Sequence, residues 1–159
     1  MVIPNNPPTT SRGAFFLLEG VDRCGKTTQG KLLLNRLVAA GLAATAMRFP
    51  DRTTATGQVI NNYLTTAGKG LDDRAIHLLF SANRWEAVGE LSKHLRSGTT
   101  IVCDRYAYSG VAFSASKVDA EGKPLLPLEW CQAPDRGLPA PDCVIFLDLE
   151  QDEAEKRGG

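Results

Sequence analysis

The sequence lacks an excess of charge of either sign. Its 18 lysines and arginines balance 18 aspartates and glutamates, so the formal net charge at pH 7 is zero with neutral histidines. This balance argues against a protein that coats DNA or a membrane surface. Glycine and proline, at 15 and nine of 159 residues, are too scarce for a collagen-like or disordered chain. The length and the 43% hydrophobic content are instead typical of one globular domain.

Long apolar runs and paired cysteine motifs are absent as well. Ala14–Leu18 and Cys143–Leu147 are far shorter than the roughly 18 apolar residues that a membrane-spanning helix needs. Residues 1–12 are rich in Pro, Asn and Thr and have no signal-peptide core, so we expect a flexible tail before a domain at 13–159. The four cysteines are scattered, at Cys24, Cys103, Cys131 and Cys143. Unpaired spacing favours reduced thiols, and hence a cytoplasmic or nuclear protein.

Short apolar runs alternate with segments of helical period, which predicts an α/β fold with a parallel sheet flanked by helices. We expect strands at 14–19, 43–49, 99–103 and 142–149, and helices at 27–40, 57–64, 72–96, 128–132 and from 152 onward. Gly41 is placed to end the first helix in a left-handed conformation. Asp72 or Asp73 is placed to cap the long helix, and Gly89 to weaken its middle.

The motif that carries chemistry is a glycine-rich loop, GVDRCGKT, from Gly20 to Thr27. It matches G-x-x-x-x-G-K-[ST] between a predicted strand and a predicted helix, which is the context of a phosphate-binding P-loop. Glycines let backbone N–H groups approach phosphate oxygens, and the helix N-terminus adds partial positive charge. Lys26 is expected to reach the β- and γ-phosphates, and Thr27 to offer a hydroxyl to Mg²⁺. A regulatory GTPase is disfavoured, because the sequence has no Asn-Lys-x-Asp motif.

Charged residues inside and beyond the loop suggest more than nucleotide binding. Arg23 is placed to act as an arginine finger in cis, whereas the Asp22 carboxylate is suited to a sugar hydroxyl. The alternative for these two residues is a loop ion pair of small energetic value. Asp104 and Arg105 follow the third strand, and ligands bind at the carboxyl ends of parallel strands. Asp104 is therefore a candidate Mg²⁺ partner, and Arg105 a candidate for a second phosphate.

Three further residues allow two interpretations from the sequence alone. Phe80 and Arg84 share one helix face, where a ring can stack on a base and a guanidinium can meet the polar edge or the phosphate. A buried core aromatic is an equally good interpretation of Phe80. Arg52, just after the second strand, is either a phosphate contact or an ordinary surface arginine.

Four motifs in this order resemble the thymidylate kinase family: LEGVDRCGKT at 18–27, RFPDR at 48–52, HLLFSANRWE at 77–86 and DRYAYSGVAF at 104–113. The resemblance runs from about residue 14 to 157 and is to the eukaryotic type, with an arginine in the P-loop. It implies a P-loop kinase fold and transfer of the ATP γ-phosphoryl group to dTMP. It also implies that the C-terminal strand and most of a mobile lid are missing from these 159 residues.

The resemblance implies roles for individual residues. Catalysis would rest on Arg23, Lys26 and Asp104, with Mg²⁺ at Thr27 and Asp104. The ATP site would comprise Gly20, Arg23, Cys24, Gly25, Lys26, Thr27, Thr28 and Arg157. The dTMP site would comprise Asp22, Phe49, Arg52, Phe80, Arg84, Arg105, Ser109 and Phe113. Among these, Asp22 would bind the sugar 3′-hydroxyl, Phe80 would stack on thymine, and Arg52 and Arg105 would hold the acceptor phosphate.

Other expectations concern partners and alternatives. Relatives form homodimers, so the resemblance implies a homodimer, and no nucleic acid or membrane partner is expected. Cys24 stands where relatives commonly have alanine, which raises the hypothesis of redox or alkylation sensitivity beside a tolerated small side chain. A nucleotide kinase with a different acceptor, and a non-catalytic or truncated nucleotide-binding product, remain the alternative functions.

Overall fold

The computed structural model describes residues 11–66 and 70–156, and its centre is a parallel four-stranded sheet in the order β2-β3-β1-β4. The strands are β1 (Phe15–Gly20), β2 (Ala44–Arg48), β3 (Thr100–Asp104) and β4 (Cys143–Leu147). β1 pairs with β3 and β4, and β2 pairs with β3, all in parallel. The predicted α/β class and the four predicted strands are confirmed.

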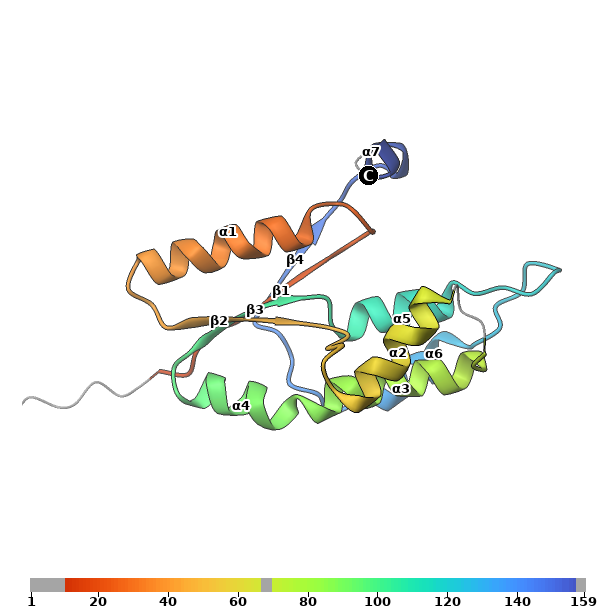
Figure 1. The fold of residues 1–159 in the computed structure, drawn as a ribbon, viewed down its shortest axis with the longest axis horizontal. Helices are drawn as coiled ribbons and strands as arrows, with labels where there is room; N and C mark the ends of the chain where they lie inside the picture. The colour runs from red at the N-terminus through yellow and green to blue at the C-terminus, as the bar shows by residue number, and fades with distance from the viewer. Residues whose placement is uncertain (1–10, 67–69, 157–159) are drawn as a thin grey trace, which may run out of the picture.

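Helices cover both faces of this sheet (Figure 1). α1 (Lys26–Ala39) lies on one face and α4 (Val88–Arg96) on the other. The main core fills the space between the sheet and α4, and its buried members are Phe15, Leu17, Phe49, Leu91, Leu95, Ile101, Cys103 and Tyr106. α1 ends as predicted, because Gly41 adopts a left-handed conformation with φ of 78°.

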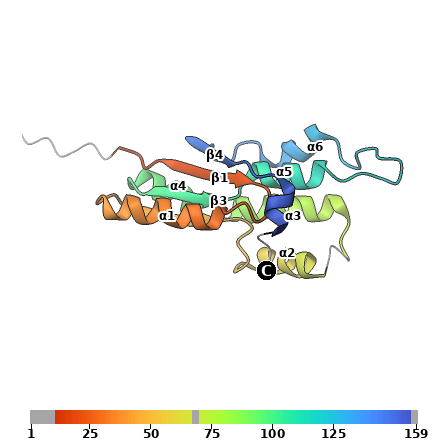
Figure 2. The same cartoon turned by 90° about the horizontal axis from the view of Figure 1, so that it is seen from above.

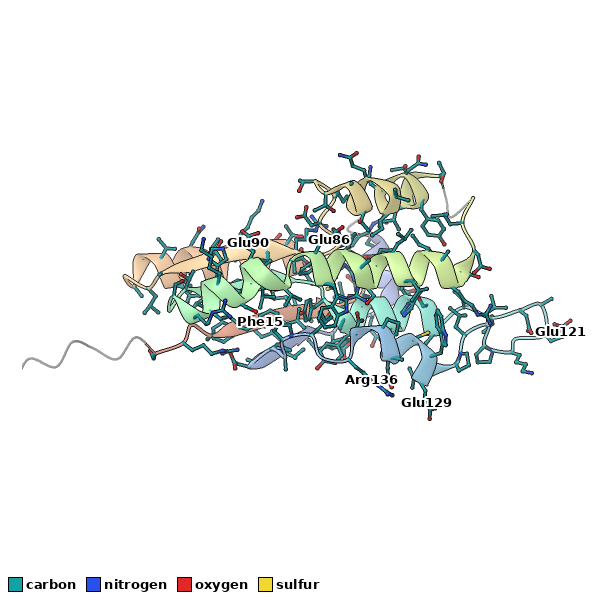
Figure 3. The ribbon with its side chains drawn as sticks, turned by 90° about the horizontal axis from the view of Figure 1, so that it is seen from below. Phe15, Glu86, Glu90, Glu121, Glu129 and Arg136 are labelled. Atoms are coloured by element: carbon teal, nitrogen blue, oxygen red, sulfur yellow. The ribbon has the colours of Figure 1, made fainter. Side chains whose placement is uncertain are left out.

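A second group of helices gathers beyond the carboxyl ends of the strands (Figures 1 and 2). It comprises α2 (Ala55–Thr65), α3 (Asp73–Glu86), α5 (Ala107–Ala115) and α6 (Leu128–Gln132), followed by a 3-10 turn, η1 (Ala133–Asp135). α3 packs against both α2 and α5, and α5 packs against α6. Glu121 marks the loop that projects between α5 and α6 (Figure 3).

The helices correct two expectations. The single helix predicted at 72–96 is two helices, because Ala87 closes α3 and α4 then packs under β3. Gly89 and the β-branched Val88 favour a break there, since both have lower helix propensity than alanine. The expected cap is confirmed, as the Asp72 side chain accepts a hydrogen bond from Arg74 N. α5 was not predicted at all.

The sheet edge at β4 is exposed. β4 has β1 on one side and, within the described residues, no strand on the other. Its side chains at Val144, Ile145 and Phe146 are exposed, Phe146 to 64%. A short helix, α7 (Gln151–Lys156), follows. Among the described helices none is long and apolar enough to cross a membrane.

The predicted N-terminal tail falls mostly outside the described residues. Within residues 11–66, Arg12 donates a 2.6 Å hydrogen bond to Asp142 Oδ2, just before β4. The same carboxylate accepts a 2.7 Å hydrogen bond from Phe15 N. Asp142 therefore ties the start of β4 to the start of β1.

Candidate nucleotide-binding site

A cavity of about 500 Å³ opens at the carboxyl ends of the strands. Residues 22, 23 and 25–28 line one side. We call this side, together with Gly20, Cys24 and Asp104, the loop side. Side chains of α3, α5 and the segments after β2 and β3 line the other, which we call the helical side. Of the predicted site residues, all but Gly20, Cys24 and Arg157 line the cavity. Arg157 lies outside the described residues.

The loop side turns sharply between β1 and α1. Arg23 and Gly25 have positive φ values of 62° and 97°. Lys26 is buried, and its Nζ donates to the backbone oxygens of Gly20 at 3.0 Å and Val21 at 2.5 Å. The lysine is thus satisfied by its own loop, whereas Arg23 is exposed at the rim.

Gly20 and Cys24 lie behind the loop and support it. A Cβ on Gly20 would come within 2.4 Å of Leu147 O and 2.9 Å of Cys24 Sγ, and the φ of 144° also requires glycine. Cys24 is buried, with Sγ 3.5 Å from Lys26 Nζ. These two residues therefore shape the P-loop from behind rather than line the cavity.

The loop side also contains a pair of oxygen groups at the start of α1. Thr27 Oγ1 donates a 2.6 Å hydrogen bond to Asp104 Oδ2. Asp104 Oδ1 is buried and has no hydrogen-bond partner among the described residues. Arg48 Nε lies 3.8 Å from Asp104 Oδ2. A hydroxyl beside a carboxylate with a free oxygen fits the oxygen ligands that Mg²⁺ prefers.

Arg84 is the most firmly held cation of the helical side. Its Nε and Nη2 donate to Asp135 Oδ1 at 3.1 Å and Oδ2 at 2.6 Å, and both side chains are more than nine-tenths buried. Ser81 Oγ also donates to Asp135 Oδ1, at 2.7 Å. A Cβ on Gly110 would lie only 2.8 Å from Arg84 Nη1, so glycine there leaves room for the guanidinium.

A second cation, Arg105, follows β3 with a left-handed φ of 69°. Its Nη1 donates to Ser109 Oγ at 3.0 Å, and its Nη2 pairs with Asp22 across the cavity. The loop ion pair considered for Asp22 and Arg23 is therefore replaced by one between Asp22 and Arg105. Buried Glu19 accepts hydrogen bonds from the backbone N–H groups of Tyr106 and Ser109, at 3.0 and 3.2 Å, and from Ser109 Oγ.

Aromatic rings close the far end of the helical side. Phe80 and Phe113 meet edge to face, with ring centroids 5.9 Å apart, and Phe80 also packs against the small core between α2 and α3. The structure therefore gives Phe80 features of both interpretations, a cavity wall and a core residue. Arg52 lines the cavity as well and donates to Asn61 Oδ1 at 3.0 Å.

A buried histidine joins the helices behind these rings. His77 Nδ1 lies 2.8 Å from Ser114 Oγ, and Nε2 lies 2.9 Å from Cys131 O. Burial lowers the pKa of His77, so the ring is neutral at pH 7. Because a carbonyl only accepts, Nε2 carries the proton and Nδ1 accepts from Ser114. The Trp130 ring packs against His77, with centroids 5.3 Å apart.

Several residues that support the site have little or no signal in the sequence. Glu19 and Asp135 hold Arg105 and Arg84, yet neither was singled out. Asn83 was not among the predicted site residues either. Its Oδ1 accepts from Asp51 N at 2.7 Å and its Nδ2 donates to Asp51 O at 3.0 Å, which fixes the loop after β2. A carboxylate that ends an apolar strand, as Glu19 does, is the one local signal that could have been followed.

Comparisons with known proteins agree with this geometry. The family model for thymidylate kinase matches residues 18–159. A thymidylate kinase from Danio rerio is 52% identical over 147 residues, and one from Homo sapiens is 48% identical over 147 residues. Each alignment covers 92% of this chain and 66% of the relative. The chain thus spans just under two thirds of the length of these relatives.

A solved structure shares the fold. The thymidylate kinase of Candida albicans superposes with a TM-score of 0.82 at 41% identity, covering 93% of this chain and 68% of that one. This likeness confirms the expected P-loop kinase fold. The family model matches most of the chain, and the P-loop and the arginine-lined cavity agree with that match. The chain therefore belongs to the thymidylate kinase family.

Proposed function

We propose that this chain transfers the γ-phosphoryl group of ATP to dTMP, forming dTDP. The observation that carries the proposal is the single cavity in which a P-loop faces a second set of cations and aromatic rings. A phosphoryl transfer needs two phosphate-binding regions that face one another, and an aromatic wall suits a flat base. The relatives' names support the choice of thymidylate as acceptor.

The loop side is the proposed ATP side. Backbone N–H groups around Gly25, Lys26, Thr27 and Thr28 would cradle the phosphates, with Gly20 and Cys24 as the support behind them. Lys26 would exchange its bonds with the backbone oxygens of Gly20 and Val21 for the β- and γ-phosphates. Exposed Arg23 would stabilise charge on the transferring group as a finger in cis. Arg157 is retained as an ATP contact on the family resemblance alone.

The helical side is the proposed dTMP side. Phe80 would stack on thymine, while Arg84 would meet the polar edge of the base with the guanidinium hydrogens that Asp135 leaves free. Arg52 and Arg105 would hold the acceptor phosphate. Asp22 would bind the 3′-hydroxyl after leaving Arg105. The remaining walls would come from Phe49, Ser109 and Phe113.

Asp104 and Thr27 would hold Mg²⁺ between them. The buried, unpartnered Oδ1 of Asp104 supports this, since no hydrogen bond within the described residues uses that oxygen. When bound there, Mg²⁺ would supply positive charge that offsets the negative charge of the phosphates. The acceptor phosphate is already anionic, so the chain needs no general base, and its residues act by positioning and by stabilising charge.

We also propose a homodimer in the cytoplasm or nucleus. The family resemblance supports the dimer, and the four free cysteines support a reducing compartment. Light scattering coupled to size-exclusion chromatography tests the dimer directly, and a monomer at micromolar concentration would contradict it.

Product analysis tests the proposed reaction. The chain is incubated with Mg-ATP and, in separate reactions, with dTMP, UMP, AMP or thymidine, and the nucleotides are separated by chromatography. We expect dTDP to form selectively. Selective phosphorylation of UMP or AMP would instead show a nucleotide kinase with a different acceptor. Tight ATP binding without any transfer would show a nucleotide-binding product that does not catalyse the reaction.

A further inference from the structure

Glu19 is a buried carboxylate to which the proposed reaction gives no part. It is the penultimate residue of β1, and only 4% of its surface is exposed. A carboxylate taken out of water is destabilising unless hydrogen bonds compensate it. All three bonds that Glu19 accepts come from one short segment, the backbone N–H groups of Tyr106 and Ser109 and the Ser109 hydroxyl. The sheet is therefore joined to the start of α5 through one side chain.

These bonds make Glu19 the cap of α5. Tyr106 is the N-cap residue of this nine-residue helix, but the accepting side chain comes from β1, about 90 positions earlier. A negative charge at a helix N-terminus is favourable because it accepts the unpaired N–H groups and opposes the positive end of the helix dipole. The cap fixes where α5 begins, and Arg105 lies immediately before it.

The Ser109 hydroxyl continues the connection to Arg105. A hydroxyl has one hydrogen to donate, and Ser109 donates it to Glu19. Its lone pairs then face Arg105, whose Nη1 donates to Ser109 Oγ at 3.0 Å. The Arg105 guanidinium is thus held from β1, the strand that leads into the P-loop. The Arg105 backbone has a left-handed φ of 69°. Arg105 Nη2 remains directed at the cavity, where it pairs with Asp22.

We propose that Glu19 is a positioning residue which acts through Ser109 to fix the guanidinium of Arg105 for the acceptor phosphate. This inference rests on the proposed function, in which Arg105 contacts that phosphate. It also defines the part of Ser109 in the wall of the dTMP side: its hydrogen is committed to Glu19, so it relays position to Arg105 and has no hydrogen left to donate to the ligand. Glu19 itself touches no substrate.

The test compares a ligand that has a phosphate with one that lacks it. Binding of dTMP and of thymidine to the 159-residue chain is measured by calorimetry, for the wild type and for Glu19→Gln. The amide keeps the shape, but its NH₂ group cannot accept the Ser109 hydrogen. We expect dTMP affinity to fall about tenfold, the effect of one hydrogen bond to a charged group, while thymidine affinity is unchanged. An equal fall for both ligands, or no fall, would overturn the proposal.

Ser109→Ala is the second variant, and it removes only the relay. It should reproduce the selective loss of dTMP affinity, and the double variant should lose less than the product of the two single effects. A thymidine loss in Ser109→Ala would show a direct sugar contact, and full additivity would show independent action; either result overturns the proposal. Asp72→Asn makes the matching carboxylate-to-amide change at the cap of α3, where no described contact reaches Arg105. It is the control and should leave the ratio of the two affinities unchanged.

The wild-type measurement separates this inference from the function on which it rests. If wild-type chain binds dTMP no more tightly than thymidine, the acceptor-phosphate site and the part of Glu19 in it both fail. If wild type prefers dTMP and Glu19→Gln keeps that preference, the proposed function stands and the positioning by Glu19 alone fails.

Discussion

The two sides of the cavity hold their cations in different ways. On the helical side, Arg84 is locked by Asp135, and Arg105 is held by Ser109 and through it by Glu19. These partners come from other elements: Glu19 and the Asp135 side chain are buried, and Ser109 is partly buried. On the loop side, Lys26 bonds to the backbone of its own loop, and Arg23 is exposed.

This difference shows which side of the cavity has its side chains in place before a ligand binds. Side chains held by such partners lose little freedom on binding, so Arg84 and Arg105 are preorganised for the ligand of the helical side, whereas Arg52 is exposed. The loop side must exchange internal hydrogen bonds for phosphate contacts. Substitutions on the helical side should therefore change folding and ground-state affinity, whereas those on the loop side should change turnover.

Arg23→Ala should cause the largest loss of turnover, by removing a catalytic group from the loop side. We expect turnover of dTMP to dTDP to fall by about 10³-fold, the size typical of a lost arginine finger. Affinity for dTMP should not change, because the exposed arginine would act only as charge develops on the transferring group. Steady-state kinetics and calorimetry measure the two quantities. Arg36→Ala, an exposed arginine in the last turn of α1, is the control and should behave as wild type.

Asp135→Asn should lower the free energy of unfolding through the helical side. Arg84 would stay buried without its counter-charge, and removing one partner of such a pair is destabilising by about 3–5 kcal/mol. The free energy of unfolding from urea titration measures this loss. Asp142→Asn is the matched control, since its pair with Arg12 is about half exposed and should contribute about 1 kcal/mol or less. Equal losses in the two variants would contradict the contrast.

Phe80→Ala should weaken the binding of dTMP but not that of ATP. Stacking of a base on an aromatic ring contributes about 1–3 kcal/mol, so dTMP affinity should fall about 5- to 150-fold. ATP affinity should stay within twofold, because Phe80 lies on the helical side. Calorimetric titration with each nucleotide decides the matter. Phe146→Ala, on the exposed edge strand, should change neither, and equal losses for both nucleotides would count against stacking.

Acid should affect the helical side through His77. Burial lowers its pKa from the ordinary value of about 6.5, so protonation favours the unfolded chain. The contribution is complete above pH 6.5 and is lost as the pH falls below it, by at most about 1.4 kcal/mol per pH unit. Unfolding free energies between pH 7.5 and 5.5 should decline in wild type and in His94→Gln. The His77→Gln variant should be less stable at pH 7.5. Its unfolding free energy should fall less between pH 7.5 and 5.5, because residue 77 no longer takes up a proton on unfolding.

The sequence predicts the loop side well and the helical side only in part. The P-loop is a contiguous motif whose spacing states its chemistry, and Asp104 and Arg105 follow a recognisable strand. The partners of Arg84 and Arg105 lie 51 and, through Ser109, about 90 positions away in the chain. Contacts over such separations depend on packing, and local pattern contains no trace of them. Asp135 therefore resembles an ordinary turn residue in the sequence.

Helix α5 was not predicted for the same reason: the local sequence pattern does not record contacts with distant elements. α5 consists largely of small and apolar residues, AYSGVAFSA, so it lacks the alternation of apolar and polar faces that marks a surface helix. Its cap is Glu19, which belongs to another element. The break at Ala87 was missed because the helical period continues through it, and only the docking of α4 under β3 separates the two helices.

The placement of the tryptophans has an optical consequence. Trp85 donates from Nε1 to Pro134 O at 2.8 Å, beside the Arg84–Asp135 pair, and Trp130 packs on His77. The chain has only these two tryptophans, and both lie among the helices behind one side of the cavity. Intrinsic emission excited at 295 nm thus reports on that half alone. Nucleotide binding to the P-loop should leave this fluorescence unchanged unless a conformational change is transmitted across the cavity. A fluorescence titration with nucleotide at the P-loop therefore reports whether the helical side responds.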